Sequence, residues 1–205
     1  MKWNEALLAQ TLKELRAQER IPASERRAAI RAQLVNSSDV NLYAFETRLG
    51  WMGMARSERG IRYLQLPRPT RAQALRDLQR EFPDGVIRRD VPEESERELC
   101  AYAEGRCRSF SAPLDLAMLR PFQRAVLIAI GKIPFGETRS YGWVAREIGQ
   151  PKAARAVGQA LHTNPIPIII PCHRVVASNG GLGGYGGGLQ MKVKLLQLEG
   201  AALNL

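Results

Sequence analysis

A cysteine and a histidine stand next to each other near the C-terminal end of the chain, in a pattern suited to nucleophilic chemistry. Cys172 and His173 lie between an apolar run, 168–170, and a glycine-rich stretch, 180–188. A cysteine reacts as its thiolate, and a neighbouring base or cation favours that form. His173 and Arg174 are therefore expected to lower the pKa of the Cys172 thiol. The same residues also fit a buried cysteine that acts only as a small apolar side chain.

The charge distribution indicates a polyanionic partner for the C-terminal part of the chain. The 205 residues have a net charge of +10 at pH 7. Residues 1–100 have 18 basic and 15 acidic side chains, whereas residues 118–205 have ten basic and three acidic ones. A basic segment around a reactive cysteine is typical of nucleic-acid binding. Solubility is the alternative reason for such a charge.

Composition excludes several classes of protein. No run approaches the roughly 18 apolar residues of a membrane span, and the N-terminal sequence lacks the pattern of a secretion signal. The three cysteines are too few for a disulfide scaffold, and Cys100 and Cys107 lack the spacing of a zinc site. The only two histidines, His162 and His173, exclude a histidine-rich metal centre. We therefore expect a cytoplasmic protein with no membrane contact, no metal and no cofactor.

Residues 1–38 are predicted to form two short helices. Leu8, Leu12 and Leu15 recur at helical spacing and make one apolar stripe. Pro22 separates this stripe from a second helix, for which Ser24 is a suitable N-cap. These residues suggest a packed extension, or a contact with a partner, and no chemistry.

Residues 39–115 indicate a small α/β domain with a linker at its end. β-forming residues alternate with turn signals in the first part, and helical patterns follow. The predicted elements are strands within 40–66 with a hairpin turn over 57–60, a helix from Thr70 to Phe82 opened by a capping box, a helix that follows Pro92 and ends near Gly105, and a linker over 109–118.

Residues 116–205 form the third predicted segment, which is mainly helical. Pro121 opens a helix that ends at Gly131, and Ser140 caps a shorter one. A tight turn then leads to a helix over 152–162, with Pro151 at its first position. Two short helices joined by a tight turn are typical of helix-turn-helix motifs.

The second helix of this motif is unusually rich in alanine and glycine, and Arg155 projects from among these small residues. Small side chains allow a close approach to another surface. That surface is either another helix of the protein or DNA, and the basic charge favours DNA.

Several motifs of this segment resemble, in the same order, those of the O6-alkylguanine-DNA alkyltransferase family. The central match is Pro171-Cys172-His173-Arg174-Val175-Val176. The other matches are Pro134-Phe135-Gly136-Glu137-Thr138, Ser140-Tyr141, Pro151 to Gly158, Asn164-Pro165 and Glu199-Gly200. The resemblance extends over most of residues 40–200. It implies an α+β fold, with a small N-terminal α/β domain that is ribonuclease H-like and a C-terminal helical domain of winged helix-turn-helix type.

The resemblance also implies an activity. Members of the family transfer an alkyl group from guanine O6 in DNA to their own cysteine, irreversibly and once per molecule. In this chain Cys172 would be the nucleophile, His173 would take the thiol proton through a water, and Glu199 would orient the imidazole. Asn164 would support the turn before the cysteine, and Tyr141 would donate a hydrogen bond to the guanine ring.

The implied partner is double-stranded DNA that contains O6-alkylguanine, bound by a monomer through the minor groove with weak sequence specificity. The target base would be flipped out of the stack, and Arg155 would fill the gap. The residues expected to bind DNA are Arg155, Ala154, Lys152, Ser140, Gly158 and Arg174. Those expected to form the base pocket are Val175, Tyr185, Gly186 and Gly187.

One departure from the family and several alternatives stay open at this point. Three glycines follow Tyr185, where several relatives have a polar or larger residue, so the loop is expected to be more flexible and roomier. Some relatives bind alkylated guanine without repairing it, but they have replaced the cysteine. A cysteine hydrolase would need a distant histidine, and only His162 is available. Glu199 could also be a surface carboxylate at the end of a helix.

Overall fold

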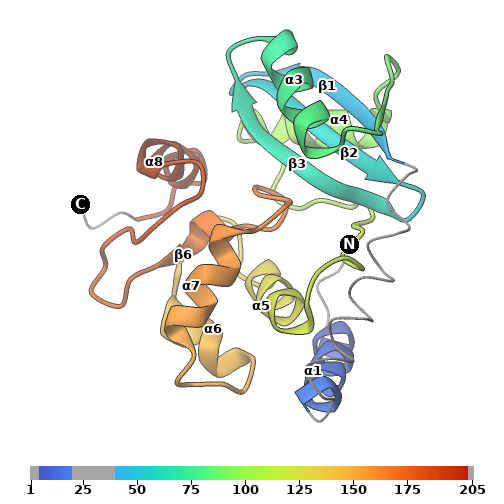
Figure 1. Ribbon diagram of the computed structural model, residues 1–205. Coiled ribbons are helices and arrows are strands. Elements are labelled where there is room, and N and C mark those ends of the chain that lie inside the picture. The colour runs from blue at the N-terminus through green and yellow to red at the C-terminus, as the bar shows by residue number, and fades with distance from the viewer. Residues whose placement is uncertain (1–4, 20–39, 203–205) are drawn as a thin grey trace. The chain divides into compact units, whose positions relative to one another are not determined.

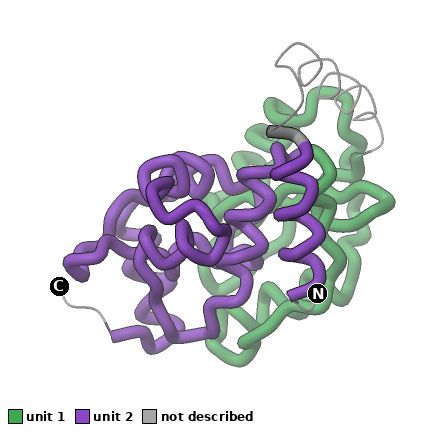
Figure 2. Tube along the Cα trace, turned by 90° about the horizontal axis from the view of Figure 1, so that it is seen from below, with its two compact units in different colours: residues 1, 30–118 green, residues 2–29, 119–205 purple. Residues whose placement is uncertain are grey.

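The computed structural model describes residues 5–19 and 40–202 (Figure 1). The chain divides into two compact units, one of residues 30–118 and one that combines residues 2–29 with 119–205 (Figure 2). The N-terminal helix thus groups with the C-terminal part of the chain. The second predicted helix, with its cap at Ser24, lies outside the described residues. The division into segments 1–38, 39–115 and 116–205 stays a prediction.

The first unit is built on a four-stranded sheet. Strands β1 (Asn41–Thr47), β2 (Gly50–Ser57) and β3 (Gly60–Arg68) are antiparallel neighbours, and β4 (Val86–Ile87) adds to β1 in parallel. The strand order is β3-β2-β1-β4. The predicted hairpin is confirmed, since its two strands pair up to the turn at 57–60. Strand β4 was not predicted, because two residues are too few to show the alternation of apolar and polar side chains that identifies a strand.

Two helices pack on this sheet and complete the core of the first unit. Helix α3 (Arg71–Glu81) begins as predicted, because the Thr70 side chain accepts a hydrogen bond from the Gln73 amide. Leu78 from α3 packs into the apolar cluster of the sheet. Helix α4 (Glu93–Ala103) follows Pro92 and buries its apolar face. The α/β character of this part is therefore as expected.

The segment 109–118 is not a free linker, and this prediction is wrong for its central residues. The Asp115 carboxylate is buried and accepts hydrogen bonds from Ser57 Oγ (2.7 Å) and from Arg62 Nε (3.0 Å) and Arg59 Nε (3.1 Å). Leu114 also forms a bridge to Ile61 of β3. Buried ion pairs between residues far apart in sequence leave no local pattern, and the sequence therefore gave no sign of this anchor.

The second unit is organised around helix α5 (Pro121–Gly131), in which every residue from 125 to 130 is buried. Pro121 occupies the first turn, as predicted. Helix α6 (Tyr141–Glu147) is capped by Ser140, whose side chain accepts a hydrogen bond from the Trp143 amide at 3.1 Å. Both predicted helix starts are confirmed.

The second helix of the predicted pair starts later than expected. Helix α7 runs over Ala154–His162, with Ala153 as its N-cap. Pro151 and Lys152 belong to the preceding turn, which is closed by a hydrogen bond from the Ala153 amide to the Gln150 carbonyl (2.9 Å). Pro151 therefore serves the turn and does not begin the helix.

Helix α1 (Glu5–Glu19) packs on α5 within the same unit. Leu8 and Leu15 of the predicted stripe are buried, and Leu12 is partly buried. Lys132, just after α5, pairs with Glu5 at 2.6 Å. Arg124, in the first turn of α5, pairs with Glu14. The two pairs join opposite ends of the helices, so α1 and α5 run antiparallel.

The rest of the second unit brings three distant segments together. A single 3-10 turn, η1 (Cys172–Arg174), leads into β6 (Val175–Val176), which pairs in parallel with β5 (Arg139–Ser140). Helix α8 (Leu189–Leu198) closes the unit and contacts η1. None of the helices in the described residues combines the length and the apolarity needed to cross a membrane.

Candidate active site

The cysteine lies at the start of η1, and an asparagine side chain fixes the turn that presents it. Asn164 Nδ2 donates to Cys172 Sγ at 3.1 Å and to the Ile170 carbonyl at 2.9 Å. Its Oδ1 accepts from the Ile166 amide at 3.0 Å. The same turn contains Ile168 with φ 75°, a value that is rare for a branched side chain. Asn164 therefore holds both a strained turn and the sulfur atom that follows it.

A buried carboxylate collects three donors from two distant segments of the chain. Glu199 Oε1 lies 2.7 Å from His173 Nε2. Arg174 Nε donates to Glu199 Oε2 at 2.8 Å, and the Gly136 amide donates to the same oxygen at 3.2 Å. Gly136 has φ 80°, and a Cβ there would lie 2.8 Å from the Glu199 carbonyl oxygen. Glu199 is thus a network residue and not a surface carboxylate.

The environment of each group fixes its charge. Burial alone would raise the pKa of Glu199, but hydrogen bonds from His173 and Arg174 lower it to about 2. Burial lowers the pKa of His173, since it penalises the imidazolium. Glu199 is therefore an anion and His173 a neutral imidazole at pH 7. With Nε2 donating its proton to Glu199, the basic nitrogen of His173 is Nδ1.

The cysteine itself is protonated at rest, contrary to the expectation from its neighbours. Burial raises the pKa of the Cys172 thiol to about 11, although the Asn164 hydrogen bond and the charge of Lys192 oppose the shift. A hydrogen bond from the His173 backbone also opposes the shift, and the guanidinium of Arg174 is engaged by Glu199. Reaction at this sulfur therefore needs a base to remove the proton at the moment of attack.

Arg174 does not contact a DNA-binding surface, and that prediction is wrong. Its side chain is buried, and its guanidinium binds Glu199 and the Ile133 carbonyl (2.6 Å). A guanidinium is rarely buried without a partner. The Glu199 carboxylate and the Ile133 carbonyl are the partners that stabilise this one. Arg174 positions Glu199.

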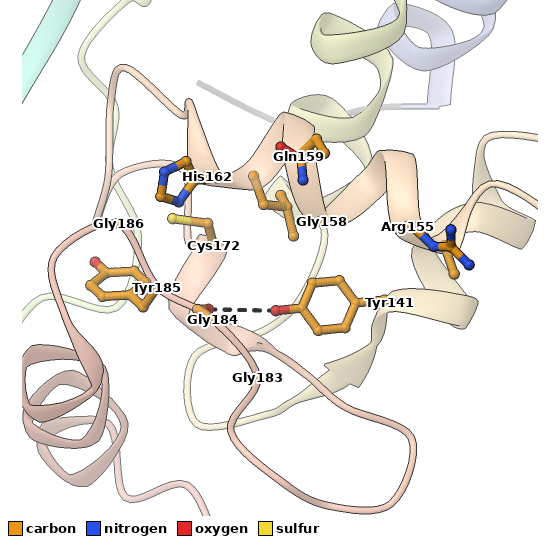
Figure 3. Close-up of a pocket in the computed structure, with 12 residues that line it drawn as sticks. Tyr141, Arg155, Gly158, Gln159, His162, Cys172, Gly183, Gly184, Tyr185 and Gly186 are labelled. Carbon is orange, nitrogen blue, oxygen red and sulfur yellow. Dashed lines mark hydrogen bonds between the residues drawn. The ribbon is translucent and has the colours of Figure 1, made fainter.

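A cavity of about 500 Å³ opens beside the sulfur (Figure 3). Cys172 lines it, and Tyr141, Arg155 and Tyr185 contribute further side chains. The Tyr141 hydroxyl donates to the Gly184 carbonyl at 3.5 Å, linking α6 to the glycine-rich loop. The volume suits a small organic ligand, and the Cys172 thiol is the reactive group that such a ligand would meet.

The structure brings half of the residues predicted to bind DNA or a base to one cavity. Ala154, Gly158 and Gly186 also line the cavity, and Lys152 is exposed in the turn before α7. Ser140 is engaged as the N-cap of α6. The other two predicted pocket residues lie elsewhere: Val175 is fully buried, and Gly187 is exposed outside the cavity lining.

Lys192 is a site residue that the sequence analysis missed. Its ammonium is buried and donates to the carbonyls of Val175 (2.6 Å), Leu182 and Gly184 (3.4 Å). Burial lowers its pKa to about 8. Lys192 thereby holds the loop over 182–184 against β6. The signal was present in the sequence, because Lys192 shares a helical face with the buried Leu195, Leu196 and Glu199.

His162 and Gln159 also line the cavity without having been predicted as site residues. Both lie on α7, on the same side as Arg155. The described residues include no cluster of three or more His, Cys, Asp or Glu side chains arranged for a metal ion.

Comparisons with known proteins identify relatives of this chain. Residues 121–201 match the family model described as 6-O-methylguanine DNA methyltransferase, DNA binding domain. The chain is 42% identical over 158 residues to a methylated-DNA–protein-cysteine methyltransferase of Methanosarcina acetivorans, which covers 77% of this chain and 96% of the relative.

Solved structures agree with this match. The crystal structure of Mycobacterium tuberculosis O6-methylguanine methyltransferase superposes with a TM-score of 0.67 at 37% identity, covering 78% of this chain and 93% of that one. Mycobacterium tuberculosis OGT in complex with DNA gives a TM-score of 0.66 at 36% identity, with the same coverage. The α+β fold expected from the motifs is confirmed.

Proposed function

Because this chain belongs to the methylated-DNA–protein-cysteine methyltransferase family, we propose that it repairs DNA by moving an alkyl group from guanine O6 to its own Cys172. One observation carries the proposal. Cys172 Sγ borders a cavity, accepts a hydrogen bond from Asn164 at 3.1 Å, and adjoins in sequence a histidine that lies 2.7 Å from a buried carboxylate. A nucleophile, a base and an orienting group are the parts that covalent catalysis by a thiol requires.

The chemistry balances as a single displacement. The Cys172 thiol proton passes through a water to Nδ1 of His173, which is neutral and therefore able to accept it. The resulting thiolate attacks the alkyl carbon, a C–S bond forms, and the C–O6 bond breaks. The electron pair of that bond goes to the guanine, which takes up one proton as the His173 imidazolium releases the one it received, so that the normal base is restored and His173 returns to its neutral form. Glu199 stabilises the imidazolium that forms.

The product explains why the protein would act once. The alkyl carbon of a thioether is a weak electrophile, because attack on it would have to expel the Cys172 thiolate, so the cysteine stays alkylated. Asn164 would keep its side chain against the Cys172 sulfur. Tyr141 lines the cavity, where it would donate a hydrogen bond to the guanine ring as negative charge develops. No cofactor takes part in this scheme.

The binding mode that we propose uses α7 as the element that meets the duplex. Ala154 and Gly158 give the helix a low profile, which suits a minor groove about 6 Å wide. Arg155 is exposed at the rim of the cavity, where it would replace the flipped nucleotide in the base stack. Contacts would be made mostly to phosphates, by a monomer, with weak sequence specificity. Residues 116–205 would form this transfer domain, with 39–115 as its companion domain and 1–38 as an extension.

Intact-protein mass spectrometry tests the proposal. After incubation with a duplex containing O6-methylguanine, we expect one added methyl group per molecule, mapped to Cys172. The Cys172→Ala variant should remain unmodified and still bind the duplex, and Cys107→Ser should be modified like the wild type. Tight binding of damaged DNA without any mass change would instead identify a recognition protein that performs no repair.

A further inference from the structure

The cavity-facing side of α7 changes character along its length. Ala154, Arg155, Gly158 and His162 all line the cavity, and the last three of these are three or four residues apart. Gly158 leaves a gap in the middle of this stripe, since it has no side chain and a Cβ there would lie 3.8 Å from the Tyr141 ring, whereas Gln159 and Leu161 line the cavity next to it. Arg155 and His162 are the large residues at the two ends. Figure 3 shows His162 at the end where Cys172 lies, with Arg155 at the far end.

The imidazole of His162 is outside the catalytic network. His173 is the histidine that pairs with Glu199. The His162 side chain is exposed and has no hydrogen bond or ion pair among the residues that the structure describes. Its backbone is nevertheless well fixed, because Gln123 of α5 donates at 3.0 Å to both the carbonyl and the hydroxyl of Thr163, the next residue. A fixed residue with an unengaged ring is suited to contact a ligand.

The opposite wall of the cavity supplies almost no side chains. It consists of the loop residues Gly183, Gly184, Tyr185 and Gly186. Gly186 approaches α7 so closely that a Cβ there would lie 3.3 Å from the His162 carbonyl oxygen. The absence of a side chain at Gly186 allows the loop to contact the end of α7. His162 then has its side chain at the place where the loop and α7 meet.

We propose that His162 is a specificity-determining residue, whose ring limits the size of the O6 substituent that can be transferred to Cys172. This inference rests on the proposed function. The carbon under attack must lie against Sγ, so that the rest of a long substituent extends along the walls beside Cys172. On the loop wall, Tyr185 is the one side chain. On the α7 wall Gln159, Leu161 and His162 contribute side chains, and His162 is the last of them and carries the only ring among the α7 residues of the lining. A flat ring there accommodates a methyl group and restricts an aromatic substituent.

Single-turnover rates of Cys172 alkylation test the proposal. Three substrates are compared: duplexes with O6-methylguanine or O6-benzylguanine, and free O6-benzylguanine base. His162→Ala should raise the ratio of benzyl to methyl rates in the duplexes on the order of tenfold, the effect of opening space in a fitted pocket. The rate with the free base should rise as well. His162→Phe preserves a flat ring and should leave the ratio within about twofold of the wild type.

The controls separate this proposal from its rivals. Lys194→Ala removes an exposed side chain of α8 outside the cavity lining and should leave all three rates unchanged. If His162→Ala slows both duplex substrates equally and spares the free base, His162 contacts the DNA backbone and the specificity proposal fails. An unchanged ratio in both variants overturns it as well. Absence of methyl transfer by the wild type would overturn the proposed function itself, and is seen before any variant is compared.

Discussion

Glu199 joins three parts of the chain at one carboxylate, and its role is therefore both chemical and structural. The loop at Gly136, the histidine of η1 and the guanidinium of Arg174 all donate to it. Replacing one partner of such a buried set leaves the others without a counter-charge. A change at Glu199 is expected to alter stability and reactivity together.

Glu199→Gln should lower the free energy of unfolding by about 3 kcal/mol at pH 7 and slow transfer to Cys172. The folded pKa of about 2 lies below the ordinary value. The Glu199 carboxylate therefore makes its whole contribution to the free energy of unfolding at pH values above the ordinary carboxyl pKa. That contribution is lost as the pH falls from the ordinary carboxyl pKa towards 2. Urea titrations between pH 7 and pH 2.5 should show the wild type and the variant converging.

Glu137→Gln is the matched control for this prediction. Glu137 is an exposed carboxylate whose pairing with Arg139 lies at the surface, so its replacement should change stability by less than about 0.5 kcal/mol. A difference between the wild type and Glu199→Gln that stays constant across the pH range would contradict the assignment of the shift to Glu199.

Residue identity at the site could be predicted from the sequence, but burial could not. The types and order of the motif residues pointed to Cys172, His173, Glu199 and Asn164, which the structure brings together. The DNA-binding role expected for Arg174 was wrong, because the sequence around a reactive cysteine does not distinguish a surface arginine from a buried one. The thiol pKa was misjudged for the same reason, since desolvation depends on atoms from α5, α7 and α8 that no local pattern reveals.

At the level of elements, α1 is an addition that covers α5. Its apolar stripe packs on the helix at the centre of the second unit, and two of its acidic residues, Glu5 and Glu14, pair with basic residues of or beside that helix. In turn, Gln123 of α5 holds the residue after α7. We therefore expect α1 to stabilise the unit that contains the site without taking part in its chemistry.

Leu8→Ala should lower the free energy of unfolding of the second unit by about 2–4 kcal/mol, the usual cost of removing a buried leucine side chain. Lys13→Ala, at an exposed position of the same helix, should have almost no effect. Hydrogen exchange of the α5 amides in the two variants provides the measurement. Equal protection in both would mean that α1 does not pack on α5 in solution.

Element types were predictable where local chemistry defines them, and less so where packing does. Thr70, Ser140 and Pro121 mark helix starts, and each prediction is confirmed. The start of α7 was placed too early because a proline suits a turn as well as a first helical position. The linker hypothesis failed at Asp115, whose partners are more than 50 residues away in sequence.

At the scale of the whole molecule, the excess positive charge is the property that a duplex would meet first. The chain carries a net charge of +10, and its C-terminal part holds most of it. Charges of this kind act through the release of counterions from DNA, an effect that does not depend on sequence.

Raising the salt concentration from 50 to 200 mM should therefore weaken binding of an undamaged duplex at least about tenfold. Lys152→Ala should reduce the slope of log affinity against log salt by about 1 if Lys152 contacts a phosphate. Arg80→Ala, which removes an exposed cation from the first unit, should leave the slope unchanged. Fluorescence anisotropy at several salt concentrations gives both slopes, and equal slopes for the two variants would argue against α7 as the DNA-facing element.

The pairing of α1 with α5 has a consequence for the order in which the protein can be completed during synthesis. Glu14 and Arg124 are separated by 110 residues, so the first helix leaves the ribosome well before its partner exists. At about 5–20 residues per second, the delay is on the order of ten seconds. During that time the strands of the first unit can already pair. The nascent chain must therefore keep the apolar side of α1 out of wrong contacts until α5 appears, and a pause or a chaperone acting in that interval would affect the yield of folded protein more than one acting later.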